Sequence, residues 1–377
     1  MTIARPSPAR LDAVEFNNMV TPYTNRLFDR LKNDGLEFAV VSCTRAERNR
    51  SWSVSPTKAY AHEILPGIEL EVGPRRFAHL NRGVFRTLSR LRPRMIVLTG
   101  FYPSMLLGLV WSRWTGTPIA LRIDGGEEDM PQSAYHRLFR PMVLKRCRAA
   151  LACSEKGAAF FRKAGFDQSG IFHMPLVPAW DAPSSLPDFQ SRGIDLIWVA
   201  EITDAIKNAA FFVEVAARLK QQRPGLTVRV IGRGPDQRAM LDGFAAAGIH
   251  VRHEEAVAWE QMAEALSDAR LLLLPSNREP WGLVCNEALQ CGTPCLVSPH
   301  VGAAGDLVLD GVNGRVLPLD VDRWVIAAAE LLGDDSTWSG MSEQARSSMM
   351  SRGIESSAKI YREMVAYVLR ADTSRLQ

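Results

Sequence analysis

Two glutamates, Glu279 and Glu287, stand eight residues apart in the segment Leu271–Pro318. The sequence predicts that Glu279 lies in a polar turn after a buried strand, and that Glu287 lies in the first turns of a helix starting near Gly282. Both carboxylates would then face one cleft at different depths. A carboxylate accepts two hydrogen bonds at once, so this pair suits the hydroxyls of a sugar.

The predicted helix start between the two glutamates offers a seat for phosphate. The backbone N–H groups around Gly282, Leu283 and Val284 have no partners within a helix, and the helix dipole favours an anion there. A phosphate seat flanked by carboxylates fits a nucleotide sugar, with Glu287 on the ribose and Glu279 on the transferred sugar. The alternative is a solvated glutamate near a helix start, stabilised by the dipole alone.

Short apolar runs alternate with helix-like segments in both halves, which is typical of parallel strands joined by crossover helices. The predicted strands are 38–42, 95–99, 119–123, 149–153, 195–200, 227–231, 249–252, 271–275 and 294–298. Each half therefore has a Rossmann-like pattern, and 377 residues exceed the usual size of one core.

A proline-rich stretch, residues 175–187, separates the halves and predicts an extended linker. We expect a first domain over residues 1–180 and a second over residues 188–345. Residues 346–377 are expected to form a helical segment that packs on the first domain, because apolar residues recur at helical spacing there.

Charge differs sharply between the halves. Residues 1–186 hold 26 Lys and Arg against 16 Asp and Glu (+10), and residues 187–377 hold 19 against 25 (−6). The first half therefore either meets something anionic, such as a membrane surface, or has a solvated basic surface. The segment Arg75–Arg94 predicts a basic amphipathic helix, which either packs on its own sheet or lies on an anionic bilayer.

Several classes of protein are disfavoured by the sequence. The composition, with 46% hydrophobic and 23% charged residues, is that of a soluble globular chain. The first ten residues lack a secretory signal, and the six cysteines show no metal-binding spacing, so we expect a cytoplasmic protein without zinc or disulfides. No nucleic-acid partner is expected.

Two short motifs argue against a metal ion and a dinucleotide cofactor. Asp320-Val321-Asp322 has the D-x-D form of a manganese site, but it opens an apolar helical run and predicts an N-cap, so no metal is expected. The turn Gly232-Arg233-Gly234 lacks the third glycine of a dinucleotide fingerprint, because Gln237 stands there.

The run E-P-W-G-L-V-x-x-E-A-L-x-x-G-T-P from Glu279, followed by G-D-L-V-x-D-G-V-N-G from Gly305, resembles the donor-site signature of retaining glycosyltransferases of family 4. The resemblance extends over most of residues 195–335. The first half is similar more faintly, at Thr21–Phe28 and Glu47–Trp52. This resemblance implies an α/β protein with the GT-B fold: two Rossmann-like domains facing across a cleft, with a C-terminal helix crossing back to the first.

By this resemblance, Glu279 holds the transferred sugar, Glu287 the ribose and Lys207 the diphosphate. The family's arginine before this lysine is replaced, because Ala200-Glu201 occupies the usual Gly-Arg position. A carboxylate beside a diphosphate is repulsive. Either Arg278 or Arg233 compensates for Glu201, or donor binding is weakened.

Other candidate residues lie near the same ligands. The resemblance places Gly232 and Arg233 near the nucleotide, with a tight turn as the alternative. The family's glycine-rich loop in the first domain is not evident, and Asn18 and Thr21 are candidate hydrogen-bond donors in its place.

A strand of the first half runs into an acidic turn. Loops after parallel strands face the cleft at the carboxyl edge, which places Asp124 and Glu127 near an acceptor hydroxyl. Asp124 is the candidate base, with helix capping by the acidic cluster as the alternative.

The resemblance implies a retaining glycosyltransferase that moves a sugar from a UDP- or GDP-sugar to a saccharide or lipid-linked saccharide in cell-envelope polysaccharide or glycolipid assembly. The nucleotide sugar is a substrate, and no cofactor or metal is expected. The expected location is the cytoplasm, at the inner face of the membrane if the basic first domain contacts anionic lipid. The alternatives are a non-catalytic sugar-nucleotide-binding protein, suggested by Glu201, and a GT-B-like nucleotide-sugar epimerase.

Overall fold

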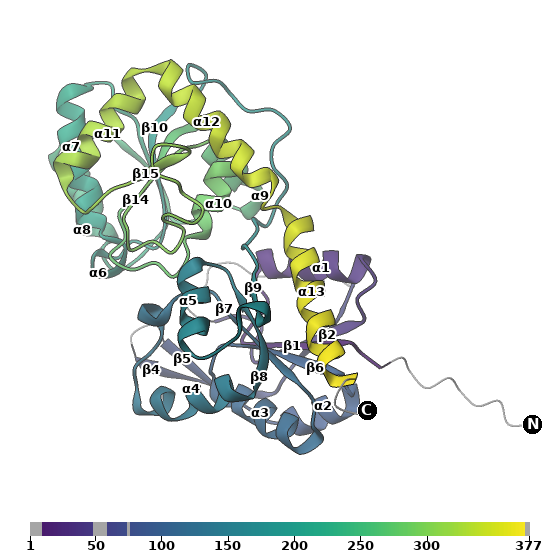
Figure 1. Cartoon of the computed structure of the whole chain (residues 1–377). Helices are drawn as coiled ribbons and strands as arrows, with labels where there is room; N and C mark the ends of the chain where they lie inside the picture. The colour runs from purple at the N-terminus through teal and green to yellow at the C-terminus, as the bar shows by residue number, and fades with distance from the viewer. Residues whose placement is uncertain (1–9, 48–58, 74–75, 374–377) are drawn as a thin grey trace, which may run out of the picture. The chain divides into compact units, whose positions relative to one another are not determined.

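The computed structural model describes residues 10–47, 59–73 and 76–373, and the chain divides into two compact units (Figure 1). The first comprises the chain up to Pro175 together with residues from Ile354, and the second spans Leu176–Gly353. The second unit includes α12 (Asp335–Met350). Trp338 of α12 is buried in its core, and its indole donates to the carbonyl of Arg270 at 2.7 Å.

A sheet of seven parallel strands, in the order β3-β2-β1-β6-β7-β8-β9, forms the centre of the described part of the first unit. The strands are β1 (Ala13–Asn17), β2 (Phe38–Ser42), β3 (Ala61–Ile64), β6 (Met95–Thr99), β7 (Ile119–Ile123), β8 (Cys147–Ala152) and β9 (Ile171–His173). Every residue of β1, β2 and β7 is buried, because helices cover both faces of the sheet.

The helices of the first unit are α1 (Pro22–Asn33), α2 (Val84–Leu91), α3 (Pro103–Thr115), α4 (Ala134–Arg146), α5 (Glu155–Lys163) and α13 (Ile354–Thr373), with 3₁₀ turns η1 (Glu127–Asp129) and η2 (Gln168–Gly170). Figure 1 shows α1 and α13 together on one side of the sheet and α2, α3 and α4 on the other. The predicted apolar stripe of α13 is confirmed, because Met364, Val365 and Val368 are buried and Ile360 is half-buried.

The predicted amphipathic helix over residues 75–94 is wrong in its first half. Residues Arg76–Asn81 form strand β5, which pairs antiparallel with β4 (Gly67–Gly73). The helix α2 begins only at Val84, after Gly83, whose φ of 82° favours glycine. Cross-strand pairing with β4, the strand that directly precedes β5 in the chain, overrides the apparent helical period.

Strand β1, which lies between β2 and β6 in the first sheet, was not predicted. It contains Glu15, which is fully buried and forms an ion pair with Arg122 of β7 at 3.0 Å. Tyr361 of α13 donates to the other oxygen of Glu15 at 2.7 Å. Burial raises the pKa of Glu15 despite these partners.

The described part of the second unit contains six parallel strands in the order β12-β11-β10-β13-β14-β15. The strands are β10 (Ile194–Val199), β11 (Val228–Ile231), β12 (Val251–Glu254), β13 (Ala269–Leu274), β14 (Cys295–Val297) and β15 (Gly314–Val316). The helices besides α12 are α6 (Asp204–Lys207), α7 (Ala209–Gln222), α8 (Gln237–Ala246), α9 (Trp259–Ser267), α10 (Leu283–Gln290) and α11 (Val321–Gly333). None of the described helices combines the length and apolar character needed to cross a bilayer.

Candidate active site

The loops that follow β10, β13 and β14 are joined by backbone hydrogen bonds at the carboxyl edge of the second sheet. The N–H groups of Asn277 and Arg278, after β13, donate to the carbonyl of Ile206 at 2.9 and 3.2 Å. Glu279 donates its N–H to the carbonyl of His300, after β14, at 3.2 Å. These bonds hold in place the backbone of the loops that carry the predicted donor-site residues, and so they limit the positions that the side chains can take.

Lys207 and Glu279 form an ion pair within this loop cluster. Their side chains are only 17% and 16% exposed, although they come from segments 72 residues apart. Lys207 ends the short helix α6, and the next residue, Asn208, takes a left-handed conformation with a φ of 58° that turns the chain into α7. The structure therefore brings together Lys207, which is predicted to bind the diphosphate, and Glu279, which is predicted to bind the transferred sugar. These two groups are adjacent in a nucleotide sugar.

Helix α10 begins beside this pair. Gly282 precedes it with a φ of 92° and provides no side-chain cap. The backbone N–H groups of Gly282, Leu283 and Val284 donate to no other described residue outside the helix. This geometry leaves donors and the positive end of the helix dipole available to an anion.

Glu287 lies one turn further along α10 and is half-buried. Burial raises the pKa of its carboxyl to about 8. The helix that carries it is anchored at its start, because the buried Trp281 donates to Asn286 Oδ1 at 2.7 Å and Asn286 donates to the carbonyl of Leu176 at 2.8 Å. A neutral carboxyl held in this way can both donate and accept hydrogen bonds, which suits a ribose diol.

The turn after β11 supports the loop that contains Glu201. A Cβ on Gly232, whose φ is 149°, would lie 1.8 Å from the carbonyl oxygen of Ala200. A Cβ on Gly234 would similarly lie 2.1 Å from the carbonyl oxygen of Ile202. The glycines thus have a packing role, which gives the predicted tight turn a physical reason.

Arg233 and Arg278 are exposed on loops at the same edge of the sheet, and neither makes an ion pair with a described residue. Glu201, the departure from the family pattern, is half-buried. The two candidate compensating cations are therefore both available to a ligand.

In the first unit, Asp124 follows β7 directly and its side chain is exposed, while its carbonyl accepts from Cys153 Sγ at 2.8 Å. Glu127 begins η1 and forms an ion pair with Lys163 at 2.6 Å. Asp129 accepts from the N–H of Gly126 at 2.9 Å. Part of the acidic cluster therefore caps η1, and Asp124 is left at the carboxyl edge of the sheet.

Asn18 lies after β1 and donates to Glu47 Oε1 at 2.8 Å. The same oxygen lies 3.3 Å from His79 Nε2, and both Glu47 and His79 are buried. Sequence reasoning missed this buried pair, since Glu47 and His79 lie on separate segments with no shared motif. Residues 48–52, the rest of the faint family match that starts at Glu47, lie outside the described residues.

Thr21 has a structural task in this structure. It is the N-cap of α1, and its hydroxyl lies 2.8 Å from Thr24 Oγ1 and accepts from the Thr24 N–H at 3.2 Å. A hydroxyl used in this way is less available to a substrate than the sequence suggested.

The predicted N-cap in the D-x-D segment is confirmed. Asp320 accepts from the backbone N–H of Arg323 at 3.2 Å at the start of α11. Asp322 instead forms an ion pair with Arg218 at 2.6 Å. The two carboxylates therefore serve separate partners.

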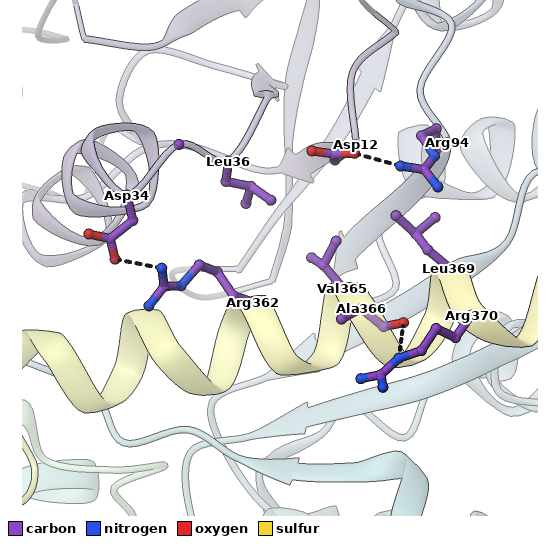
Figure 2. Close-up of a pocket in the computed structure, with 10 residues that line it drawn as sticks. Asp12, Asp34, Leu36, Arg94, Arg362, Val365, Ala366, Leu369 and Arg370 are labelled. Carbon is purple, nitrogen blue, oxygen red and sulfur yellow. Dashed lines mark hydrogen bonds and ion pairs between the residues drawn. The ribbon is translucent and has the colours of Figure 1, made fainter.

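A groove of about 550 Å³ lies at the opposite, amino edge of the first sheet (Figure 2). Its polar rim is paired internally, by Arg94 with Asp12 at 2.9 Å and by Arg362 with Asp34 at 3.4 Å. Ligands of parallel α/β sheets bind at the carboxyl edge. This groove is therefore separate from the candidate site residues of the first unit.

Two family models match the chain, the "Glycosyl transferase 4-like domain" over residues 20–176 and "Glycosyl transferases group 1" over residues 193–334. The glycogen synthase of Mycobacterium tuberculosis is 31% identical over 143 residues, covering 36% of this chain and 33% of that protein. The chain thus spans about a third of the length of that relative. The D-inositol 3-phosphate glycosyltransferase of Arthrobacter sp. is 22% identical over 331 residues, covering 78% and 77%.

The fold is similar to that of Anabaena HepE, solved in complex with UDP and glucose, with a TM-score of 0.72 over 94% of this chain and 99% of that one, at 14% identity. Both units are therefore those of a GT-B protein. The chain belongs to the glycosyltransferases of family 4.

Proposed function

We propose that this protein is a retaining glycosyltransferase that transfers a hexosyl group from a nucleoside-diphosphate sugar to a saccharide or lipid-linked saccharide. The observation that carries the proposal is the Lys207–Glu279 ion pair at the open start of α10. HepE was solved with UDP and glucose, which makes UDP-glucose the first donor to test. We propose that the protein's role in the cell is the assembly of a polysaccharide or glycolipid.

The donor site that we propose lies wholly in the second unit. The diphosphate would accept from the N–H groups at the start of α10 and from Lys207, which then exchanges Glu279 for phosphate oxygens. The released Glu279 carboxylate would bind the sugar hydroxyls, and Glu287 would bind the ribose. Arg233 and Arg278 would offset the negative charge of Glu201, so no metal ion is needed to neutralise the diphosphate.

In the reaction that we propose, the bond from the anomeric carbon to the diphosphate oxygen breaks, and the acceptor oxygen bonds to the same face of that carbon. Lys207 and the α10 amides stabilise the charge that develops on the leaving diphosphate. The acceptor's proton passes to the leaving phosphate oxygen. Retention follows from attack on the face that the diphosphate leaves.

The proposal is tested by incubating the protein with UDP-glucose and candidate acceptors and following the anomeric proton of the product by NMR. The proposal predicts release of UDP and a product with the donor's α configuration. A β-linked product would contradict retention. EDTA should leave the rate unchanged.

A non-catalytic sugar-nucleotide-binding role is the second candidate, because Glu201 stands half-buried where the family has a cation. It predicts donor binding without release of UDP. Replacing Glu201 by Arg separates the two, since restored turnover would identify Glu201 as the cause of inactivity.

A further inference from the structure

The outer surface of α2, α3 and α4 in the first unit is unusually apolar. We call this surface the α2–α4 face, and its large exposed apolar residues are Leu107 (40%), Val110 (53%), Trp114 (74%), Leu138 (63%) and Met142 (52%). The three from α3 lie at positions i, i+3 and i+7, and the two from α4 at i and i+4. Each set therefore forms one stripe along its helix.

Helix α4 shows how far this pattern departs from an ordinary crossover helix. Only Val143 of its 13 residues is fully buried. A crossover helix normally turns its apolar stripe inward, toward the sheet. Here Leu138 and Met142 point outward, so core packing does not account for them.

The same three helices are strongly basic. Their 34 residues (8 + 13 + 13) contain seven Lys and Arg and no Asp or Glu. Four of the cations, Arg86, Arg113, Arg137 and Lys145, are exposed and pair with no described residue. On the other side of the sheet, α1 and α13 carry charges of both signs. The positive charge of the first half is thus concentrated where the exposed apolar residues lie.

We propose that the α2–α4 face docks in the plane of an anionic lipid bilayer. Aliphatic and tryptophan side chains interleaved with unpaired cations suit the boundary between acyl chains and headgroups. Anionic headgroups attract the four unpaired cations, because the three helices themselves contain no acidic residue. A bound nucleic acid would place its phosphates next to Leu138 and Met142, and these apolar side chains cannot form hydrogen bonds or ion pairs with phosphate.

The test is flotation of the purified full chain with vesicles of phosphatidylcholine and phosphatidylglycerol, against phosphatidylcholine alone. The proposal predicts binding to the anionic vesicles that high salt reverses. Leu138→Glu and Arg137→Glu should each weaken binding by about tenfold. The matched controls are Ile326→Glu, at a residue 57% exposed, and Arg323→Glu, both on α11 of the second unit, and these should bind as the parent protein does.

Depth of insertion gives a second readout. Brominated lipids quench tryptophan that enters the bilayer, and Trp114 is the most exposed of the described tryptophans. Trp114→Phe should abolish the quenching. The proposal is overturned if the parent protein does not bind anionic vesicles, or if the control variants lose binding equally. It is also overturned if the parent protein self-associates in a concentration-dependent way without lipid and the α4 variants lose this self-association.

This inference does not depend on the proposed activity. UDP binding and UDP release with a water-soluble acceptor should be unchanged in Leu138→Glu, which also shows that the variant is folded. A protein that binds vesicles but no donor would refute the proposed function alone, and the reverse result would refute the docking surface alone.

Discussion

Replacing Glu287 by Gln should stabilise the protein in a pH-dependent way. The carboxyl is half-buried, and burial raises its pKa from 4.5 to about 8. The folded protein therefore keeps the proton up to about pH 8, while the unfolded chain releases it from about pH 4.5. Stability is consequently lost as the pH rises through this window, and no further loss occurs above it.

The size of the effect follows from the pKa shift. The rise in the pKa of Glu287 from 4.5 to about 8 corresponds to about 5 kcal/mol above pH 8 and about 3 kcal/mol at pH 7. Glutamine has nearly the same shape and no proton to lose, so Glu287→Gln should gain these amounts relative to the parent protein. Near pH 5 the two proteins should differ by less than about 1 kcal/mol.

Urea unfolding followed by far-ultraviolet circular dichroism near pH 5, 7 and 9 measures this difference. The control is Glu343→Gln, at an exposed residue of α12, and its stability should stay close to that of the parent protein. A gain for Glu287→Gln that stays constant with pH would refute the reasoning. A parent protein that becomes more stable between pH 5 and 8 relative to the variant would refute it as well.

Three further variants test local features. Gly232→Ala should lower the free energy of unfolding by about 3 kcal/mol, because its Cβ would lie 1.8 Å from the carbonyl oxygen of Ala200; calorimetry showing an unchanged Tm would contradict this. Tyr361→Phe should cost about 1 to 3 kcal/mol in urea unfolding, because buried Glu15 loses a donor, and a stabilised variant would contradict that cost. Asp320→Ala should cost about 1 kcal/mol through loss of the α11 N-cap while leaving UDP release intact, and a metal-dependent loss of activity would contradict the capping role.

Several elements could be predicted from the sequence because their signal is local. The predicted strands 38–42, 95–99 and 119–123 coincide with β2, β6 and β7, which are short apolar runs bounded by polar or turn residues. Strand β1 was missed because Glu15 interrupts its apolar run. The buried carboxyl of Glu15 is stabilised by Arg122 and Tyr361. Both partners are distant in the sequence, so no local pattern predicts them.

The failed helix over residues 75–94 has a related cause. Phe77 and Leu80 of β5 and Val84 and Leu88 of α2 fall at helical spacing by coincidence, although they belong to two elements. The pairing of β5 with β4 decides between strand and helix there, and β4 precedes the segment that was interpreted as one helix.

The candidate site was predictable as a set of residues but not as an arrangement. The family motif indicated Lys207, Glu279 and Glu287 by type and spacing. That Lys207 pairs with Glu279, and that burial raises the pKa of Glu287, depends on how the loops after three strands pack. The faint family match starts at Glu47, but it gave no sign that Glu47 pairs with His79 in a buried position.

Calorimetric titration of the full chain with UDP, GDP and ADP and their common sugar conjugates tests the central claim most directly. We predict that one of these nucleotides binds with micromolar affinity and that Lys207→Ala and Glu287→Ala each weaken it at least about tenfold. Arg323→Ala, at an exposed residue of α11, is the control and should leave the affinity unchanged. Absence of binding to every nucleotide, or binding that both site variants retain in full, would contradict the account.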